Sequence, residues 1–362
     1  MGFSCGLVGL PNAGKSTILN ALANVGARVE SYPFCTITTN VGTVPVPDPR
    51  LDRLAALFPE KEKVPTRLEF VDIAGLVERA SEGEGMGNQF LAEIRSVDAI
   101  CHVVRCFRDA DVAHVAGSLD PRRDAEIVET ELLLKDYETL RRVADRLHQE
   151  AKAADRRAAA RAGACDDLLE KVAQGMPVRS VQVDPVLEDV LRDAAPLTAK
   201  PCLYVANVGD DGENEWVPLI AEFAQAQSSE VVSIRGRLEA EIAEVAATPE
   251  ERAIFLAEYG LSHTGLSSLV EAGYRLLGLV TFFTIDGPEV RAWTVPEKTK
   301  APQAGARIHS DFADRFVLAE VATVDDLLDA GSEKALRDEG KVRRAGHDYV
   351  VAEGDVIHFI CA

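Results

Sequence analysis

Short apolar runs recur along the first part of the chain, and stretches with helical spacing separate them. An apolar run of about four to eight residues between turn signals is typical of a buried strand. A helix is expected at Lys15–Asn24, and strands are expected at Phe3–Leu10, Leu68–Ile73, Ala99–Val104, Cys202–Ala206 and Val231–Ile234. Strands that alternate with helices predict an α/β domain whose mostly parallel sheet is covered on both faces.

A longer helical pattern lies between the third and fourth of these strands. Apolar and alanine positions recur there at the heptad spacing of paired helices, at Leu133, Tyr137, Leu140, Ala144, Leu147, Ala151, Ala154 and Ala158. We expect Gly163 to interrupt this helix and a second helix, Asp166–Gln174, to end at Gly175. The pattern predicts an antiparallel helical arm inserted into the α/β domain. The alternative is an ordinary surface helix that packs on the sheet.

Beyond about residue 278 the pattern changes to short strands between Gly and Pro turns. Strands are expected at Val280–Ile285, Val290–Val295, Phe316–Val321 and Val356–Ile360, with a helix at Val324–Ala330. This pattern predicts a small mixed β domain. The expected division is an α/β domain of residues 1–125 and 199–278, a helical insertion of residues 126–198, and a C-terminal domain of residues 279–362.

Composition and charge narrow the class of protein. Hydrophobic residues make up 47% and charged residues 27% of the 362, which is enough for a packed core. The net charge of −20 argues against non-specific nucleic-acid binding. We expect no membrane span, because no apolar run reaches about 18 residues. We expect no secretory signal, because the N-terminus lacks a basic region followed by an apolar stretch. The seven cysteines are scattered and form no CxxC pair, so a cytoplasmic protein with reduced thiols and no zinc site is expected.

The stretch from Gly9 to Ser16 reads GLPNAGKS and matches the Walker A pattern at every required position. Its glycines let backbone N–H groups turn toward phosphates. Lys15 would place a cation against the β- and γ-phosphates, and Ser16 would give a hydroxyl ligand to Mg²⁺. The expected strand before it and helix after it favour this interpretation over a chance glycine-rich turn. The chain is therefore predicted to bind and hydrolyse a Mg-nucleotide.

Two further elements are typical of a switch NTPase. Asp72–Gly75 reads DxxG at a strand end, where Asp72 would hold the Mg²⁺ shell and the Gly75 amide would sense the γ-phosphate. Thr36 lies in a threonine-rich loop and could ligate Mg²⁺, although a plain β segment is the alternative. Leu76 stands where many regulatory GTPases carry a water-orienting Gln. Intrinsic turnover is therefore expected to be slow, on the order of 10⁻⁴ s⁻¹.

Several longer stretches resemble a known family. They are GLPNAGKST at Gly9–Thr17, YPFCTITTNVG at Tyr32–Gly42, DIAGLVERASEGEGMGNQFL at Asp72–Leu91, HVVRCF at His102–Phe107 and APQAGARIHSDF at Ala301–Phe312. Together they resemble the YchF subfamily of Obg-related P-loop NTPases, also called Obg-like ATPases. The resemblance covers the whole chain.

The resemblance implies a Ras-like G domain, a coiled-coil arm and a C-terminal TGS domain of β-grasp type. It also implies Mg²⁺-dependent hydrolysis of ATP and association with ribosomes. Ser16, Thr36 and Asp72 would form the metal site, and Lys15 and Gly75 would act in hydrolysis. The residues that would bind phosphate are Asn12, Ala13, Gly14, Lys15, Ser16 and Thr17.

The base-reading motif departs from the family pattern. A guanine site carries NKxD, in which the Asp accepts from the guanine edge and the Lys covers the base plane. The matching stretch here is Asn207–Asp210, NVGD, which lacks the lysine, whereas family members usually carry NxxE. ATP is favoured because the guanine clamp is incomplete, and Asp210 keeps GTP as the alternative. Asn207 would bond the adenine edge, Val208 would pack on the base, and Ser233 and Ile234 would add a backbone contact.

Two residues could replace the missing catalytic Gln. His114 matches a histidine suggested in the family as the water-orienting group, and the alternative is a loop histidine without a role. Asn12 matches a P-loop asparagine that, in related NTPases, helps to hold K⁺ where an arginine finger would otherwise lie.

The expected arm is locally basic. Between Arg141 and Arg161 the charge is +4, which could contact an RNA backbone. The alternative is a solvated coiled-coil face, and only the family resemblance favours a ribosome. The predicted function is thus a slow Mg-ATPase switch that binds ribosomes as a monomer. Alternatives are a nucleotide-dependent adaptor with negligible turnover, a strict GTPase because of Asp210, and, ranked last, a P-loop kinase.

Overall fold

The computed structural model describes residues 2–29, 41–73, 84–109, 111–112, 114, 117–152, 155–212, 214–246 and 248–362. The chain divides into two compact units, Met1–Val44 with Glu69–Gly273 and Pro45–Leu68 with Tyr274–Ala362. Within the described ranges, none of the helices combines the length and apolar character needed to cross a membrane.

A six-stranded sheet forms the centre of the first unit, in the order β2-β4-β1-β5-β6-β7. The strands are β1 (Phe3–Val8), β2 (Val41–Pro45), β4 (Arg67–Asp72), β5 (Ala99–Cys106), β6 (Cys202–Val208) and β7 (Glu230–Ile234). The pairs β1–β5, β5–β6 and β6–β7 are parallel. The five expected strands are therefore confirmed, and β2 is an additional one.

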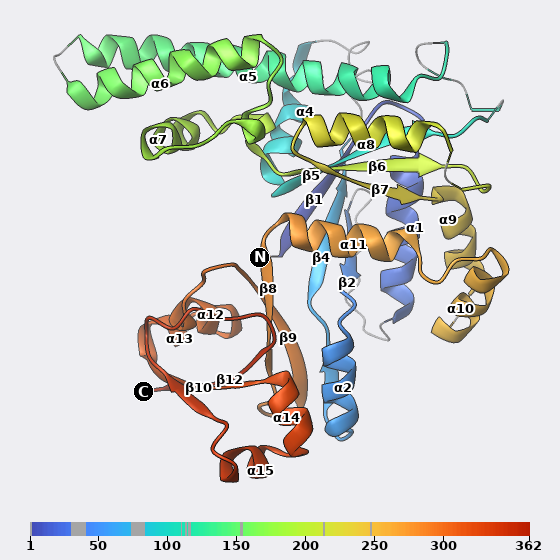
Figure 1. Ribbon diagram of the computed structural model, residues 1–362, viewed down its shortest axis with the longest axis vertical. Coiled ribbons are helices and arrows are strands. Elements are labelled where there is room, and N and C mark those ends of the chain that lie inside the picture. Colours follow the sequence, from blue (N-terminus) through green and yellow to red (C-terminus); the bar gives the residue numbers. More distant parts are fainter. Residues whose placement is uncertain are drawn as a thin grey trace. The chain divides into compact units, whose positions relative to one another are not determined.

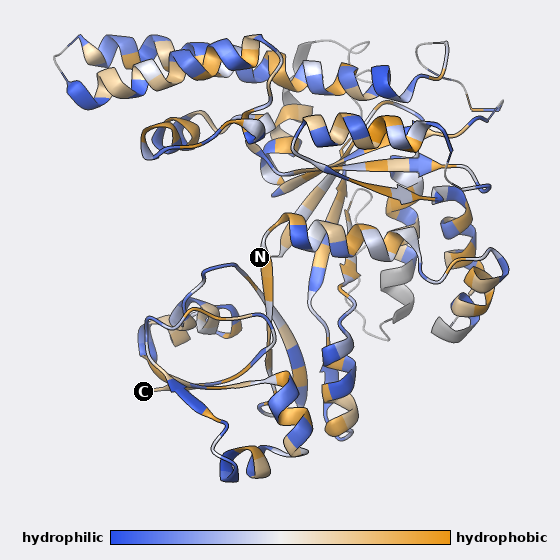
Figure 2. Cartoon of the chain, in the orientation of Figure 1, coloured by the Kyte–Doolittle hydropathy of each residue, from blue (hydrophilic) through white to orange (hydrophobic). Residues whose placement is uncertain are grey.

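Helices cover both faces of this sheet, as the alternating pattern predicted (Figure 1). They are α1 (Lys15–Val29), α4 (Glu84–Ser96), α5 (Pro121–Ala151), α8 (Trp216–Ala226), α9 (Gly236–Val245) and α11 (Gly265–Leu276), while α10 (Pro249–Glu258) packs on α9. A large apolar cluster joins β5 and β6 to α4, α5 and α8, through side chains such as Ile94, Val128, Tyr204 and Ile220. Strongly apolar strands lie at the centre in Figure 2.

The chain between β5 and β6 is mostly helical. It contains α5, α6 (Arg156–Ala173) and α7 (Pro185–Ala194), and α5 and α6 lie side by side with opposite directions (Figure 1). The expected helix break at Gly163 is wrong, because Gly163 lies inside α6. The break falls before Asp155, whose side chain accepts hydrogen bonds from the N–H groups of Arg157 and Ala158 and caps α6.

The heptad pattern identified most, but not all, of the buried face of α5. Leu140 and Leu147 are fully buried, whereas Tyr137 is 37% exposed. Asp136 is buried instead, because its carboxylate accepts from the N–H groups of Leu197 (2.6 Å) and Thr198 (2.8 Å). These donors belong to a 3₁₀ turn that would otherwise leave them unpaired.

The first turns of α5 belong to the core of the sheet. Ala125, Val128 and Leu132 pack with β5 and β6, while residues from Leu133 onward pack with α6 and α7. A domain boundary at residue 126 therefore falls inside one continuous helix. The first turns of α5, up to Leu132, thus pack on the sheet as an ordinary surface helix would. The rest of α5 pairs with α6 as the predicted helical arm would.

The second unit is built on a mixed sheet with the order β11-β10-β12-β8-β9-β3. Its strands are β3 (Glu62–Val64), β8 (Leu279–Thr284), β9 (Glu289–Pro296), β10 (Phe316–Thr323), β11 (Arg343–Ala345) and β12 (Asp355–Cys361). Its helices are α2 (Pro49–Leu57), α12 (Ala301–Ile308), α13 (Asp311–Arg315), α14 (Val324–Ala330) and α15 (Glu333–Asp338). The four expected strands and the expected helix α14 are confirmed.

The boundary of this unit differs from the expected one, because residues 45–68 belong to it rather than to the α/β domain. Strand β3 pairs in parallel with β9. Leu51 and Leu54 of α2 are buried against Phe283 and Val290. These apolar contacts join two segments that are far apart in the sequence.

Candidate functional site

The loop between β1 and α1 has the backbone that a phosphate-binding loop requires. Gly14 and Asn12 have left-handed φ angles of 99° and 62°. Asparagine is among the few residues other than glycine that adopt this region readily. Lys15 is 7% exposed, and its Nζ donates to the carbonyls of Gly9 and Leu10, each at 3.1 Å. The ammonium group is thus held at the loop and the N-terminus of α1.

Ser16, in the first turn of α1, meets Asp72, the last residue of β4. Ser16 Oγ donates to Asp72 Oδ2 at 2.6 Å. Asp72 Oδ1 is buried and has no hydrogen-bond partner within the described residues. A hydroxyl and a carboxylate are oxygen ligands that Mg²⁺ prefers, and the unpaired buried oxygen leaves an acceptor for its hydration shell. The residues present therefore fit a magnesium ion.

Asn207, at the end of β6, ties the phosphate loop to α9. Its Nδ2 donates to the Ala13 carbonyl at 2.9 Å, and its Oδ1 accepts from the Gly236 N–H at 3.1 Å. A Cβ on Gly14 would lie 2.1 Å from Asn207 Nδ2, so this close approach requires glycine. Both hydrogen bonds of the Asn207 side chain go to the protein backbone. Its hydrogen bond to a base stays a prediction.

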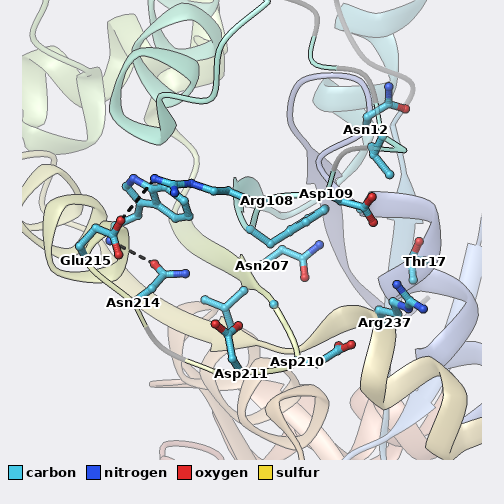
Figure 3. Close-up of a pocket in the computed structure, with 16 residues that line it drawn as sticks. Asn12, Thr17, Arg108, Asp109, Asn207, Asp210, Asp211, Asn214, Glu215 and Arg237 are labelled. Atoms are coloured by element: carbon cyan, nitrogen blue, oxygen red, sulfur yellow. Dashed lines mark hydrogen bonds and ion pairs between the residues drawn. The ribbon is translucent and has the colours of Figure 1, made fainter.

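A cavity of about 660 Å³ opens beside this amide (Figure 3). Asn12, Gly14 and Thr17 line it from the phosphate loop, and Val208 and Asp210 line it from the end of β6. At one end the Arg108 guanidinium lies over the Trp216 ring, 5.1 Å from its centroid, and 3.7 Å from Glu215. The cavity joins the phosphate loop to a partly aromatic wall, which suits a nucleoside.

Two predicted base contacts do not line this cavity. Ile234 is 1% exposed because it ends β7 in the core, and Ser233 precedes it in the strand. The cavity wall at this edge comes from Arg237, in the first turn of α9 (Figure 3). Asp210 lies on the exposed rim, as a base-reading residue would.

The segment after β5 forms a wall of the cavity that belongs to none of the nucleotide-binding motifs. Arg105 is 5% exposed, and its guanidinium donates to the carbonyls of Phe107, Asp109 and Val112. Phe107, Arg108 and Asp109 line the cavity. The sequence could have indicated this segment, because it follows a predicted strand. Loops at the carboxyl ends of adjacent parallel strands gather around one site.

His114 lies close to the phosphate loop. Its Nε2 is 2.7 Å from Asp124 Oδ2, and the two side chains are 11% and 5% exposed. The pair borders a small cavity that Leu10, Pro11 and Ala13 also line. The predicted Mg²⁺ ligand Thr36, the predicted sensor Gly75 and Leu76 lie outside the described residues.

Comparisons with known proteins cover the whole chain. The family model YchF-GTPase_C, described as a protein of unknown function, matches residues 279–361. The model described as 50S ribosome-binding GTPase matches residues 4–140. Proteins named ribosome-binding ATPase YchF are 45% identical in Haemophilus ducreyi, over 361 residues, and 46% identical in Bacillus subtilis, over 364 residues. Each of these matches covers 99% of both chains.

Solved structures agree with the sequence comparison. The Schizosaccharomyces pombe YchF GTPase has a TM-score of 0.88 and 33% identity, over 99% of this chain and 97% of that one. A GTP-binding protein from Pyrococcus horikoshii has a TM-score of 0.60 at 18% identity, over 99% and 100% of the two chains, and shares the fold. Because these relatives match it over nearly its full length, the chain belongs to the YchF family.

Proposed function

We propose that this chain is a slow, Mg²⁺-dependent ATPase whose nucleotide state controls binding to ribosomes. The observation that carries the proposal is the phosphate loop with its 2.6 Å contact between Ser16 and Asp72 beside a cavity for a nucleoside. The relatives named ribosome-binding ATPase support both the nucleotide and the partner.

In this proposal Ser16 and Asp72 hold Mg²⁺, together with Thr36. When bound, the ion neutralises charge on the phosphate oxygens. Lys15 adds a second positive charge at the loop, and the Gly75 amide contacts the γ-phosphate. His114 orients the attacking water, because Leu76 has no polar atom for this task.

The base preference is proposed to favour adenine. Val208, which is 4% exposed, stands where a guanine site carries lysine, and its apolar side chain gives no cation over the base. Asp210 is an exposed acceptor at the rim of the cavity. Competition between ATP and GTP for the purified protein in Mg²⁺ tests this step. Tighter binding of GTP would favour a strict GTPase that reads guanine through Asp210.

Turnover separates the switch from its main alternative. Phosphate release with ATP should be slow alone and should rise when ribosomes are added. No release above background in either condition would instead indicate a nucleotide-dependent adaptor. Replacing K⁺ by Na⁺ in the same assay tests whether Asn12 helps to hold K⁺, in which case release should slow.

The ribosome contact is proposed to lie on the helical pair α5–α6, the coiled-coil arm of the family. Several of its arginines are paired with α7, since Arg146 and Arg161 both contact Asp193 and Arg157 contacts Asp189. Arg141 and Arg156 are exposed and make no ion pair within the described residues. They are therefore the better candidates for phosphate contacts.

Charge reversal tests that surface. The double variant Arg141→Glu/Arg156→Glu should lose ribosome co-sedimentation. The control Lys298→Glu/Lys334→Glu changes the net charge equally at exposed positions outside the helical pair and should keep it. Equal co-sedimentation of the two variants would place the contact elsewhere.

The remaining assignments are also proposals. The C-terminal residues 279–362 are assigned to a TGS domain of β-grasp type, and residues 126–198 to the helical insertion. We further propose that the protein acts as a cytoplasmic monomer, which size-exclusion chromatography with light scattering would test.

A further inference from the structure

Asp124 lies in the first turns of α5 with its carboxylate turned toward the segment after β5. It is 4% exposed, and its Oδ2 is 2.7 Å from His114 Nε2. Its other oxygen lies 3.5 Å from the Arg123 guanidinium. Burying a carboxylate costs desolvation free energy, so a carboxylate this deeply buried requires a specific partner.

The helix that carries Asp124 is anchored at this point. Asp120 caps α5 by accepting from the Arg123 N–H at 3.2 Å, and Pro121 follows at its first position. Ala125 and Val128 are 0% and 1% exposed in the core beneath. The carboxylate is thus fixed to the same core as the strands that carry the phosphate loop.

His114 is constrained from two sides. Arg105 holds the preceding segment through the carbonyls of Phe107, Asp109 and Val112. Asp124 holds the imidazole itself. The same small cavity is bordered by the imidazole, the carboxylate and residues of the phosphate loop, so the pair lies directly beside that loop.

We propose that Asp124 is a positioning residue that sets the tautomer and ring orientation of His114. The inference rests on the proposed function, in which His114 orients the attacking water. A carboxylate accepts only, so Nε2 carries the hydrogen and donates to it, and the lone pair lies on Nδ1. Nδ1 is then the acceptor that a water O–H requires, in the same way that a buried aspartate sets the tautomer in a Ser-His-Asp triad.

Turnover and nucleotide affinity test this role separately. Asp124→Asn keeps the shape but can present an N–H to the ring, so ATP turnover should fall about 10- to 100-fold, with ATP affinity changed less than about two-fold. Glu126→Gln is the matched control, because it removes one charge two residues further along α5, from an exposed pair with Arg122. The control should turn over like the wild type.

A double-mutant cycle and NMR separate positioning from a structural effect. If Asp124 acts through the imidazole, His114→Ala/Asp124→Asn should be no slower than His114→Ala alone. Additive losses would overturn the inference. ¹⁵N NMR of the intact wild type should show the hydrogen on Nε2 of His114, and a hydrogen on Nδ1 would overturn the inference whatever the turnover.

The same experiments distinguish this inference from the proposed function. A wild-type chain that releases no phosphate from ATP contradicts the proposed function. A wild-type chain that turns over, slows in His114→Ala and is unchanged in Asp124→Asn contradicts the positioning role alone.

Discussion

His102 is an ionisable side chain in the interior of β5. It is 2% exposed, and its ring centroid is 5.0 Å from that of Tyr204. Burial, with the positive charges of Arg179 and Lys15, lowers the pKa of His102 to about 3 from 6.5. The native state therefore keeps this ring neutral at pH values where the unfolded chain protonates it.

This difference predicts an acid-sensitive stability. The folded pKa lies below the unfolded one, so the contribution is fully present above pH 6.5 and declines as the pH falls toward 3. When the pH falls from about 7.5 to 5.5, the titration of His102 should lower the free energy of unfolding by about 1.4 kcal/mol. Urea unfolding at both pH values should show this loss in the wild type, and His102→Gln should lack that part of it. Equal losses in the two proteins would mean that the ring is protonated in the native state.

The roles of single residues were predictable where a motif is local. The Walker A spacing located Lys15 and Ser16 because one loop sets the whole geometry. Asp124 belongs to no motif, and its role depends on a helix that packs beside the loop only after folding. Ile234 was predicted to contact the base because it ends a strand at the edge of the sheet where the cavity lies. Which residues line the cavity there depends on where α9 begins, and Arg237 of α9 takes this position.

At the scale of elements, α6 shows that a glycine need not end a helix. A Cβ on Gly163 would meet nothing within 4 Å. Gly163→Ala should therefore raise the unfolding free energy by about 0.5–1 kcal/mol, because alanine loses less backbone entropy in a helix. Thermal unfolding followed by circular dichroism measures this. The reverse change on the same helix, Ala160→Gly, should lower stability by a similar amount. A loss of stability in Gly163→Ala or a gain in Ala160→Gly would contradict the assignment of α6.

Helix α5 connects the proposed ribosome contact to the His114–Asp124 pair. Its 31 residues span about 46 Å as one helix. Each glycine at an exposed interior position weakens a helix by about 1 kcal/mol relative to alanine. The variant Glu138→Gly/Arg142→Gly should keep the basal rate of phosphate release. It should lose about half or more of the rise in that rate that ribosomes cause. The control Glu138→Ala/Arg142→Ala removes the same side chains and should keep the increase.

Most strands of the molecule were predictable, but β2, β3 and β11 were not, nor was the grouping of the strands into units. Apolar runs located the expected strands because burial on both faces leaves a continuous signal. Strand β3 carries Glu62 and Lys63, which are exposed, so no apolar pattern marks it. Its place depends on pairing with β9, more than two hundred residues later in the chain.

The composition of the second unit predicts how fragments of the chain behave. Leu51 and Leu54 of α2 are 3% and 0% exposed against residues of β8 and β9. The Glu62 N–H donates to the Pro288 carbonyl at 2.8 Å, and Lys61 Nζ donates to the Ile285 carbonyl. A fragment of residues 274–362 would expose the apolar surface that these leucines cover, at about 1.5–3 kcal/mol for each leucine.

That fragment should therefore unfold without a sharp transition or aggregate, although it contains every residue that the C-terminal family model matches. Joining residues 45–68 to residues 274–362 through a flexible linker should restore a cooperative thermal transition. A Leu51→Asp/Leu54→Asp version of the joined fragment is the matched control and should behave like residues 274–362 alone. Cooperative unfolding of residues 274–362, with the midpoint of the joined fragment, would show that residues 45–68 are an accessory rather than part of this core.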